Sequence, residues 1–107
     1  MLKYCSIGSG SSHYVGYKDT NILIDAGLSG KRISKGLENI DVDISKLRGI
    51  FVTHEHSDHI KGLGVLSRKY DLPIYLNYKT WLALESKIGK IKESNVMIFD
   101  NDKAYDL

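Results

Sequence analysis

The stretch THEHSDH, residues 53–59, carries three of the four histidines in this chain. In an extended segment, residues two apart point to the same side, so His54 and His56 can aim at one point. Asp58 and His59 follow where the chain is expected to turn into a helix, and they can aim at a second point nearby. Imidazoles beside a carboxylate suit Zn, Fe or Mn in a hydrolytic centre with open positions. The spacing therefore predicts a metal site built from these four residues.

Two residues of this stretch also have simpler interpretations. Asp58 could merely cap the helix that follows, but capping is compatible with metal binding and explains none of the histidines. Glu55 is expected to point to solvent, away from His54 and His56, so it is given no catalytic role.

The segments on either side of the motif predict a strand and a helix. Residues 47–53 contain a short apolar run with β-branched and aromatic residues, which favours a buried strand. Residues 60–70 have apolar residues at helical spacing and are expected to form a helix that ends before Pro73. Gly62 and Gly64 lower the helix propensity, but small residues there would let the backbone approach a sheet or the motif closely.

The first forty residues predict strands followed by a helix. Strands are expected over residues 2–7, 12–17 and 20–25, with Lys18-Asp19 as a hairpin turn. The small residues 8–12 are interpreted mainly as a tight loop, because they lack the lysine and the spacing of a phosphate-binding loop. Ser29 is expected to cap a helix that runs through Ile40.

The segment after Pro73 predicts another strand, a helix and a final strand. The first strand is expected over residues 73–76, and Asn77 or Thr80 would cap a helix that ends at Gly89. The apolar side of that helix is expected to comprise Trp81, Leu82, Leu84 and Ile88. Residues 96–99 predict the last strand. Strands first, and then strands alternating with helices, indicate a layered α/β domain.

The composition limits the remaining possibilities. A chain of 107 residues, 42% of them hydrophobic, permits one domain or part of one. A formal charge of +2 is too close to neutral to argue for nucleic acid by electrostatics alone, and the basic clusters are interpreted as solvated faces. The single Cys5 is expected to be a small core residue on an inner strand, and it favours a reducing, cytoplasmic location. No run is long enough to span a membrane, and no membrane partner is expected.

The chain resembles the metallo-β-lactamase superfamily. Residues 54–59 match its H-x-H-x-D-H motif, and the apolar run that ends in Asp25-Ala26-Gly27 is similar to its first motif. The opening SIGSGSS, residues 6–12, looks most like a small bacterial exonuclease-like branch. The resemblance implies a four-layer αββα sandwich, of which residues 1–107 would form about the N-terminal half, a mixed sheet with flanking helices.

The resemblance also implies roles for individual residues. His54 and His56 would hold one divalent metal, while Asp58 and His59 would hold a second; zinc is the expected metal, with manganese or iron as alternatives. Asp25 would support the ligand loop through hydrogen bonds, although it could also be an ordinary turn residue. The implied activity is hydrolysis of a phosphodiester, with nucleic acid as the substrate, by a hydroxide that the metals bridge, and Asp58 is the expected catalytic residue.

Two departures from the family keep other functions open. The first is that the chain is long enough for only about half of the family's fold, whose later ligands are two more histidines and a bridging aspartate, and no histidine follows His59. The chain alone is therefore expected to be inactive, with partial metal occupancy, and to self-associate through its exposed sheet. The second departure is at residues 11–14, Ser-Ser-His-Tyr, where the family is expected to have a longer loop that contains Gly or Asn. His13 is expected to be a strand or surface histidine. The alternatives are a truncated, non-catalytic half-domain and an iron-containing redox member of the superfamily.

Overall fold

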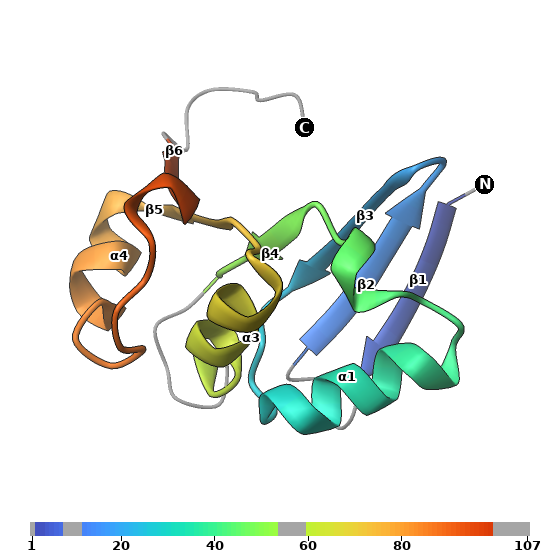
Figure 1. The fold of residues 1–107 in the computed structure, drawn as a ribbon. Coiled ribbons are helices and arrows are strands. Elements are labelled where there is room, and N and C mark those ends of the chain that lie inside the picture. Colours follow the sequence, from blue (N-terminus) through green and yellow to red (C-terminus); the bar gives the residue numbers. More distant parts are fainter. Residues whose placement is uncertain (1, 8–11, 54–59, 100–107) are drawn as a thin grey trace.

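The computed structural model describes residues 2–7, 12–53 and 60–99, and within them one six-stranded sheet carries helices on one side (Figure 1). The strands lie side by side in chain order: β1 (Leu2–Ile7), β2 (Ser12–Tyr17), β3 (Thr20–Ile24), β4 (Gly49–Phe51), β5 (Ile74–Asn77) and β6 (Val96–Phe99). The helices are α1 (Gly30–Asn39), α3 (Leu63–Tyr70) and α4 (Tyr78–Leu84), with short 3₁₀ turns η1 (Ile44–Lys46) and η2 (Glu93–Asn95). This is the mixed sheet with flanking helices that the sequence predicts.

The topology explains why the helices share one side of the sheet. Strands β1 to β3 form an antiparallel meander, whereas β3 to β6 are parallel neighbours. Each parallel pair is joined by a crossover that steps in the same direction along the sheet. Because such crossovers are right-handed, the connecting helices all pack on the same face. The opposite face is left without a helix in the described part of the chain.

The hydrophobic core lies between the sheet and the helices. One row of paired residues crosses all six strands on this covered face: Cys5, Tyr14, Leu23, Ile50, Ile74 and Val96. Leu23, Ile50 and Ile74 are completely buried. From α1, Ile33 and Leu37 complete this core, as the helix predicted from Ser29 requires. Ser29 caps α1, with its side chain accepting a hydrogen bond from the Arg32 amide at 3.3 Å.

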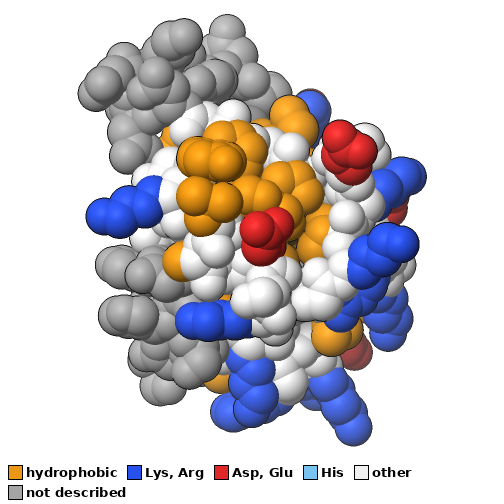
Figure 2. Space-filling view, turned by 90° about the vertical axis from the view of Figure 1, so that its left-hand side faces the viewer, with side chains coloured by type: hydrophobic (Ala, Val, Ile, Leu, Met, Phe, Trp, Pro, Cys, Tyr) orange, Lys and Arg blue, Asp and Glu red, His pale blue; other side chains and the backbone are white. Residues whose placement is uncertain are grey.

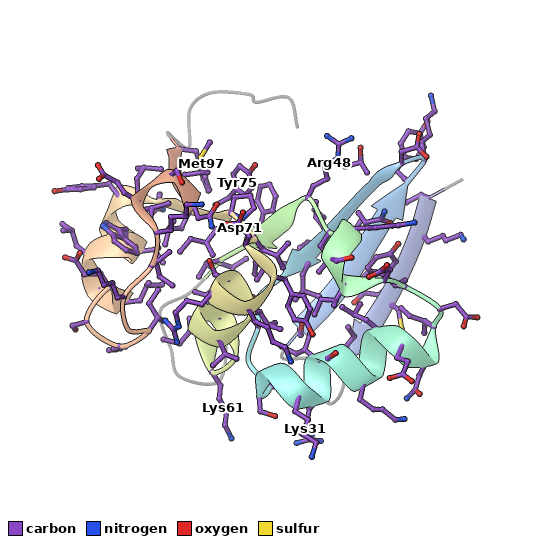
Figure 3. All side chains as sticks on the ribbon, in the orientation of Figure 1. Lys31, Arg48, Lys61, Asp71, Tyr75 and Met97 are labelled. Carbon is purple, nitrogen blue, oxygen red and sulfur yellow. The ribbon has the colours of Figure 1, made fainter. Side chains whose placement is uncertain are left out.

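The other face of the sheet, which we call the open face, is apolar, and no element of the described residues covers it. The adjacent row of paired residues on this side reads Ser6, His13, Ile24, Phe51, Tyr75 and Met97. The Phe51 and Tyr75 rings stack with centroids 4.7 Å apart. The next row contains Tyr4, Val15, Ile22 and Gly49. No Asp, Glu, Lys or Arg occupies either row. Charged side chains such as Lys31 and Lys61 extend instead from the helical side of the sheet (Figure 3).

The structure corrects the expected end of α4. This helix ends at Leu84 rather than Gly89, and Leu82 is 53% exposed instead of lying on the buried side. Tertiary contacts draw the chain after Leu84 toward α3: Nη1 of Arg68 donates to the Ile88 carbonyl at 2.7 Å. Trp81 is half-buried against the core, as expected.

Smaller differences concern β4, α3 and Cys5. The regular part of β4 is shorter than the predicted strand, and regular α3 begins at Leu63. Cys5 lies on the edge strand β1 and is only partly buried, so the prediction that it lies on an inner strand was wrong. Its side chain does pack against the core.

The side of the molecule that carries α4 and β6 exposes a group of apolar side chains (Figure 2). The exposed large apolar residues of these two elements are Tyr78, Leu82, Met97 and Ile98. Within the described ranges, none of the helices has the length and apolar character needed to cross a membrane.

Candidate metal centre

The expected metal ligands His54, His56, Asp58 and His59 lie outside the described residues, so their assignment stays a prediction. The structure describes the residues on both sides of them, Thr53 and Ile60. Within the described part of the chain, no group of three or more His, Cys, Asp or Glu side chains could hold a metal ion. The structure therefore describes the residues that hold the two ends of the motif in place.

Asp25 is the best defined of these supports. It follows β3 directly, and its φ of 61° places it in the left-handed region, which aspartate tolerates better than most residues. Its side chain is 4% exposed, and its backbone N–H donates to the Phe51 carbonyl at 2.7 Å. The turn after β3 is thereby attached to the end of β4, the strand that leads to the motif.

The Asp25 carboxylate binds the residue that directly precedes His54. Oδ1 accepts a hydrogen bond from the Thr53 backbone N–H at 2.8 Å, and Oδ2 accepts one from the Thr53 hydroxyl at 2.5 Å. Hydrogen bonds to a charged acceptor are stronger than neutral ones, so both oxygens of one carboxylate fix the entry to the motif. Asp25 thus hydrogen-bonds a residue of the next strand connection, and its role as a support for metal ligands stays a prediction.

Two further polar residues at this site were not singled out from the sequence. Thr53 supplies both donors to Asp25, and Ser12, which is completely buried, donates from its hydroxyl to the Asp25 carbonyl at 2.7 Å. A polar residue at an inward-facing strand position is the only signal that could have indicated Ser12. Its hydrogen bond connects the start of β2 to the same turn.

The turn after Asp25 packs closely against the start of α3. The Gly62 N–H donates to the Ala26 carbonyl at 2.7 Å, and a Cβ on Gly62 would lie 2.4 Å from the Leu28 carbonyl oxygen. The small residues thus permit a close backbone approach, as expected, but the residue that Gly62 approaches, Leu28, lies in the turn after β3 and not in a strand. A Cβ on Gly64 would lie 2.2 Å from the Ile88 carbonyl oxygen.

His13 is a strand histidine, as expected. It lies on the open face in β2, where its Nδ1 is 2.6 Å from the Tyr4 hydroxyl and its ring stacks on that of Tyr4. Its partner in the sheet register is Ile24, the residue before Asp25.

Comparison with known proteins agrees with this geometry. Residues 6–104 match the model of the metallo-beta-lactamase superfamily. The chain is 50% identical over 101 residues to exodeoxyribonuclease YycJ of Bacillus anthracis, covering 92% of this chain and 38% of the relative. It is 46% identical to exodeoxyribonuclease WalJ of Streptococcus pneumoniae, covering 96% of this chain and 40% of the relative. The metallo-β-lactamase MIM-1 of Novosphingobium pentaromativorans superposes with a TM-score of 0.64 at 26% identity, over 70% of this chain and 28% of that structure.

The chain therefore belongs to the metallo-β-lactamase superfamily. Its α/β architecture is part of the fold of that superfamily, as predicted. The chain spans about 40% of the length of the curated relatives it matches.

Proposed function

We propose that this chain contributes the first part of a metal-dependent hydrolase that cleaves phosphodiester bonds in DNA. The observation that carries the proposal is the attachment of Thr53, the residue before the H-x-H-x-D-H motif, to the buried Asp25 carboxylate. Such outer hydrogen bonds orient metal ligands and are commonly required for affinity. The similarity to two exodeoxyribonucleases favours DNA over other esters as the substrate.

The donor set of the motif fits divalent metal ions. His54, His56 and His59 would supply imidazole nitrogens and Asp58 a carboxylate, a combination that suits zinc and also permits manganese or iron. A metal bound there would activate water and stabilise negative charge on the phosphate. Asp25 would fix the direction in which the chain enters the ligand set. A buried, doubly hydrogen-bonded carboxylate in this position supports the assignment.

The 107 residues alone should show little hydrolysis. They cover about 40% of the relatives, and the motif provides only four donors for two metals. Metal occupancy should then be partial, or completed by water or by a neighbouring chain. This favours the non-catalytic half-domain as the second candidate for the isolated chain. Metal analysis of protein purified without added metal separates a hydrolase from an iron-containing redox member. The cytoplasmic location stays a prediction.

Self-association is the other property that we propose for the isolated chain. Parallel strands normally have both faces of their sheet covered, and here one face is open and apolar. The four-layer sandwich of the family would place a second sheet there. In the isolated chain a second copy is the available cover, and β1 and β6, the outer strands of the described sheet, add to this tendency.

Metal binding is tested with the double variant His54→Ala/His56→Ala. The expected result is loss of the first metal, measured by elemental analysis after dialysis, with circular dichroism unchanged. A double substitution of His13 and Lys18 by alanine is the control, because neither residue is a predicted ligand. Tight stoichiometric metal in the His54/His56 variant would contradict the ligand assignment.

Activity is tested on labelled single-stranded DNA with zinc or manganese, using the 107-residue chain and a longer form that carries the missing ligands. Only the longer form should release nucleotides. Asp58→Ala should abolish its turnover without unfolding it, whereas the neighbouring Glu55→Ala should leave turnover intact. Equal activity of both forms would show that the first part suffices. Full metal loading of the longer form without hydrolysis would remove the nuclease assignment.

A further inference from the structure

Helix α3 is flanked by two grooves that share Val65 as their common ridge. The first groove runs between α1 and α3, and its lining includes Lys31, Lys35 and Lys69. The second lies between α3 and the loop after α4, and its lining includes Lys61, Arg68 and Lys87. Their volumes are about 840 and 1050 Å³. All six cationic residues are exposed, and Val65 between the grooves is 49% exposed.

The charge of these linings is almost entirely positive. Glu38 is the one acidic residue that lines either groove. In the described ranges, the ion pair is between Lys92 and Asp71, so none of the groove cations is neutralised by a described carboxylate. In Figure 2, Lys and Arg side chains gather along the lower edge, the direction in which Lys31 and Lys61 extend in Figure 3. A net charge of +2 thus conceals a strong asymmetry, because the open face carries no charged side chain in its two described rows.

The position and the other linings of the grooves suit an extended anionic strand. The second groove begins at Gly27, two residues after Asp25, and at Lys61, two residues after the motif. The first groove extends to Tyr70, whose ring lies 5.4 Å from the Lys69 Nζ. Cationic grooves with an aromatic side chain are typical of single-strand binding, where phosphates meet the cations and a base can stack on the ring.

We propose that the two grooves beside α3 bind the phosphodiester backbone of a DNA single strand and lead it toward the motif. This inference rests on the proposed function and adds a binding surface to it. The grooves lie on the helical side, so pairing of two chains through the open face leaves them accessible. The shared chemistry is that of any nucleic-acid single strand, so an RNA strand of the same sequence is measured in parallel.

The test compares two triple variants that lose the same charge. Lys31→Gln/Lys35→Gln/Lys69→Gln removes cations from the first groove, whereas Lys18→Gln/Lys46→Gln/Lys79→Gln removes exposed lysines elsewhere. Affinity for a fluorescent 20-nucleotide single strand is measured by anisotropy in EDTA over a range of salt concentrations. The groove variant should bind at least about tenfold more weakly, and its log–log salt slope should fall by about 2, since each phosphate contact on a single strand contributes about 0.7. The control variant should keep the slope of the original chain.

Several results would overturn the inference. These are no binding by the original chain, equal losses in the two variants, or equal competition by polyglutamate of matched charge, which would indicate an acidic protein partner. Preference for RNA over DNA would assign the surface to RNA. Should the groove variant fail to fold by circular dichroism, Lys35→Gln against Lys46→Gln gives the same comparison. Because binding is measured without metal, loss of hydrolysis in the longer form with intact binding would contradict only the proposed function.

Discussion

Two neighbouring rows of residues cross the same six strands and meet different surroundings. The row through Leu23, Ile50 and Ile74 is completely buried by α1, α3 and α4. The row beside it, through Ile24, Phe51 and Tyr75, is only half-buried, and Met97 at its end is 42% exposed. Sheets with one face in water usually alternate apolar and polar residues. This sheet is apolar on both faces, a pattern that is typical of sheets with both faces covered.

The strongest test of this difference is a pair of substitutions at adjacent positions of β3. Leu23→Ala should destabilise the chain by about 2–5 kcal/mol, because it leaves a cavity in the core. Ile22→Ala, on the open face, should cost clearly less in dilute solution. Its cost should grow with protein concentration, since association through that face stabilises the folded chain. Urea unfolding at several concentrations measures both, and equal, concentration-independent losses would show that the two faces do not differ.

Asp25 continues the covered face beyond the end of β3, and its replacement tests how firmly that end is fixed. Asp25→Asn should cost about 1–3 kcal/mol, because the amide cannot accept from both the N–H and the hydroxyl of Thr53. Thermal unfolding measures this loss. Asp43→Asn, at an exposed carboxylate that caps η1, is the matched control and should have a smaller effect. An equally small effect at Asp25 would show that its hydrogen bonds contribute little.

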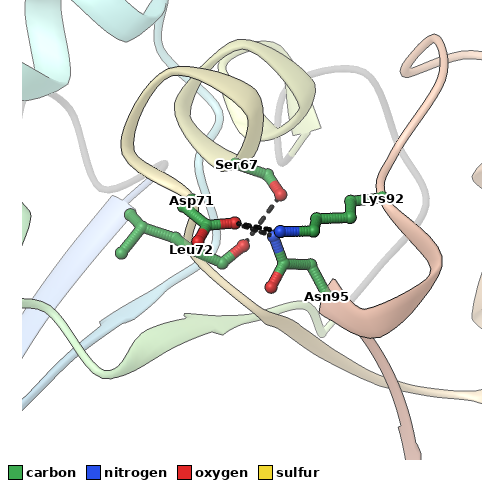
Figure 4. A network of polar contacts seen from close by, with 5 residues as sticks. All are labelled: Ser67, Asp71, Leu72, Lys92 and Asn95. Carbon is green, nitrogen blue, oxygen red and sulfur yellow. Dashed lines mark hydrogen bonds and ion pairs between the residues drawn. The ribbon is translucent and has the colours of Figure 1, made fainter.

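The smallest expected effect lies where α3 meets η2 at the margin of the sheet. Asn95 donates to the Asp71 carboxylate at 2.8 Å, and the Lys92 ammonium is 3.6 Å from the same oxygen (Figure 4). The Asn95 hydrogen bond and then the Lys92 charge lower the pKa of Asp71. A lowered pKa stabilises the folded state above the unfolded pKa of about 3.9, and this contribution disappears as the pH falls through the folded-state pKa.

The substitution Asp71→Asn tests this contribution and keeps a residue that tolerates the left-handed backbone at φ 54°. The variant should have a slightly lower urea midpoint than the original chain at pH 7 and the same midpoint at about pH 2. The nearby hydrogen bond from the Ser67 hydroxyl to the Leu72 carbonyl does not involve the Asp71 side chain and should be kept in the variant (Figure 4). A difference that persists unchanged at low pH would contradict the electrostatic origin.

Local signals in the sequence were enough to place most of the elements. Apolar periodicity located the strands, and Ser29 is the cap that the pattern predicts. Of the two alternatives for the next helix, Asn77 and Thr80, the cap is Asn77, whose side chain accepts from the Thr80 amide at 2.8 Å. The predicted end of α4 was wrong, because contacts of Arg68 with the loop after Leu84 decide where the helix ends. Arg68 is distant in sequence from that loop. Local patterns cannot report such contacts.

The candidate site shows the same difference between what local patterns indicate and what only contacts between distant residues decide. Asp25 could be singled out through the resemblance, whereas for its partner Ser12 the sequence offers only a polar residue at an inward-facing strand position. The pairing of β3 with β4 and β2 brings Asp25 together with Thr53 and Ser12. The clustering of lysines beside α3 was equally hidden, since Lys35 and Lys69 are far apart in the sequence and line one groove. The contribution of each residue depends on the fold, not on its neighbours in the chain.

The open face is tested most directly by sedimentation equilibrium of the 107-residue chain and two variants. Phe51→Lys places a charge on the open face, and Val65→Lys places one at an exposed apolar position on the helical side. The original chain and Val65→Lys should associate with increasing concentration, whereas Phe51→Lys should remain monomeric with an unchanged circular dichroism spectrum. A stable monomer of the original chain at high concentration, or association of Phe51→Lys as strong as that of the original chain, would contradict the account.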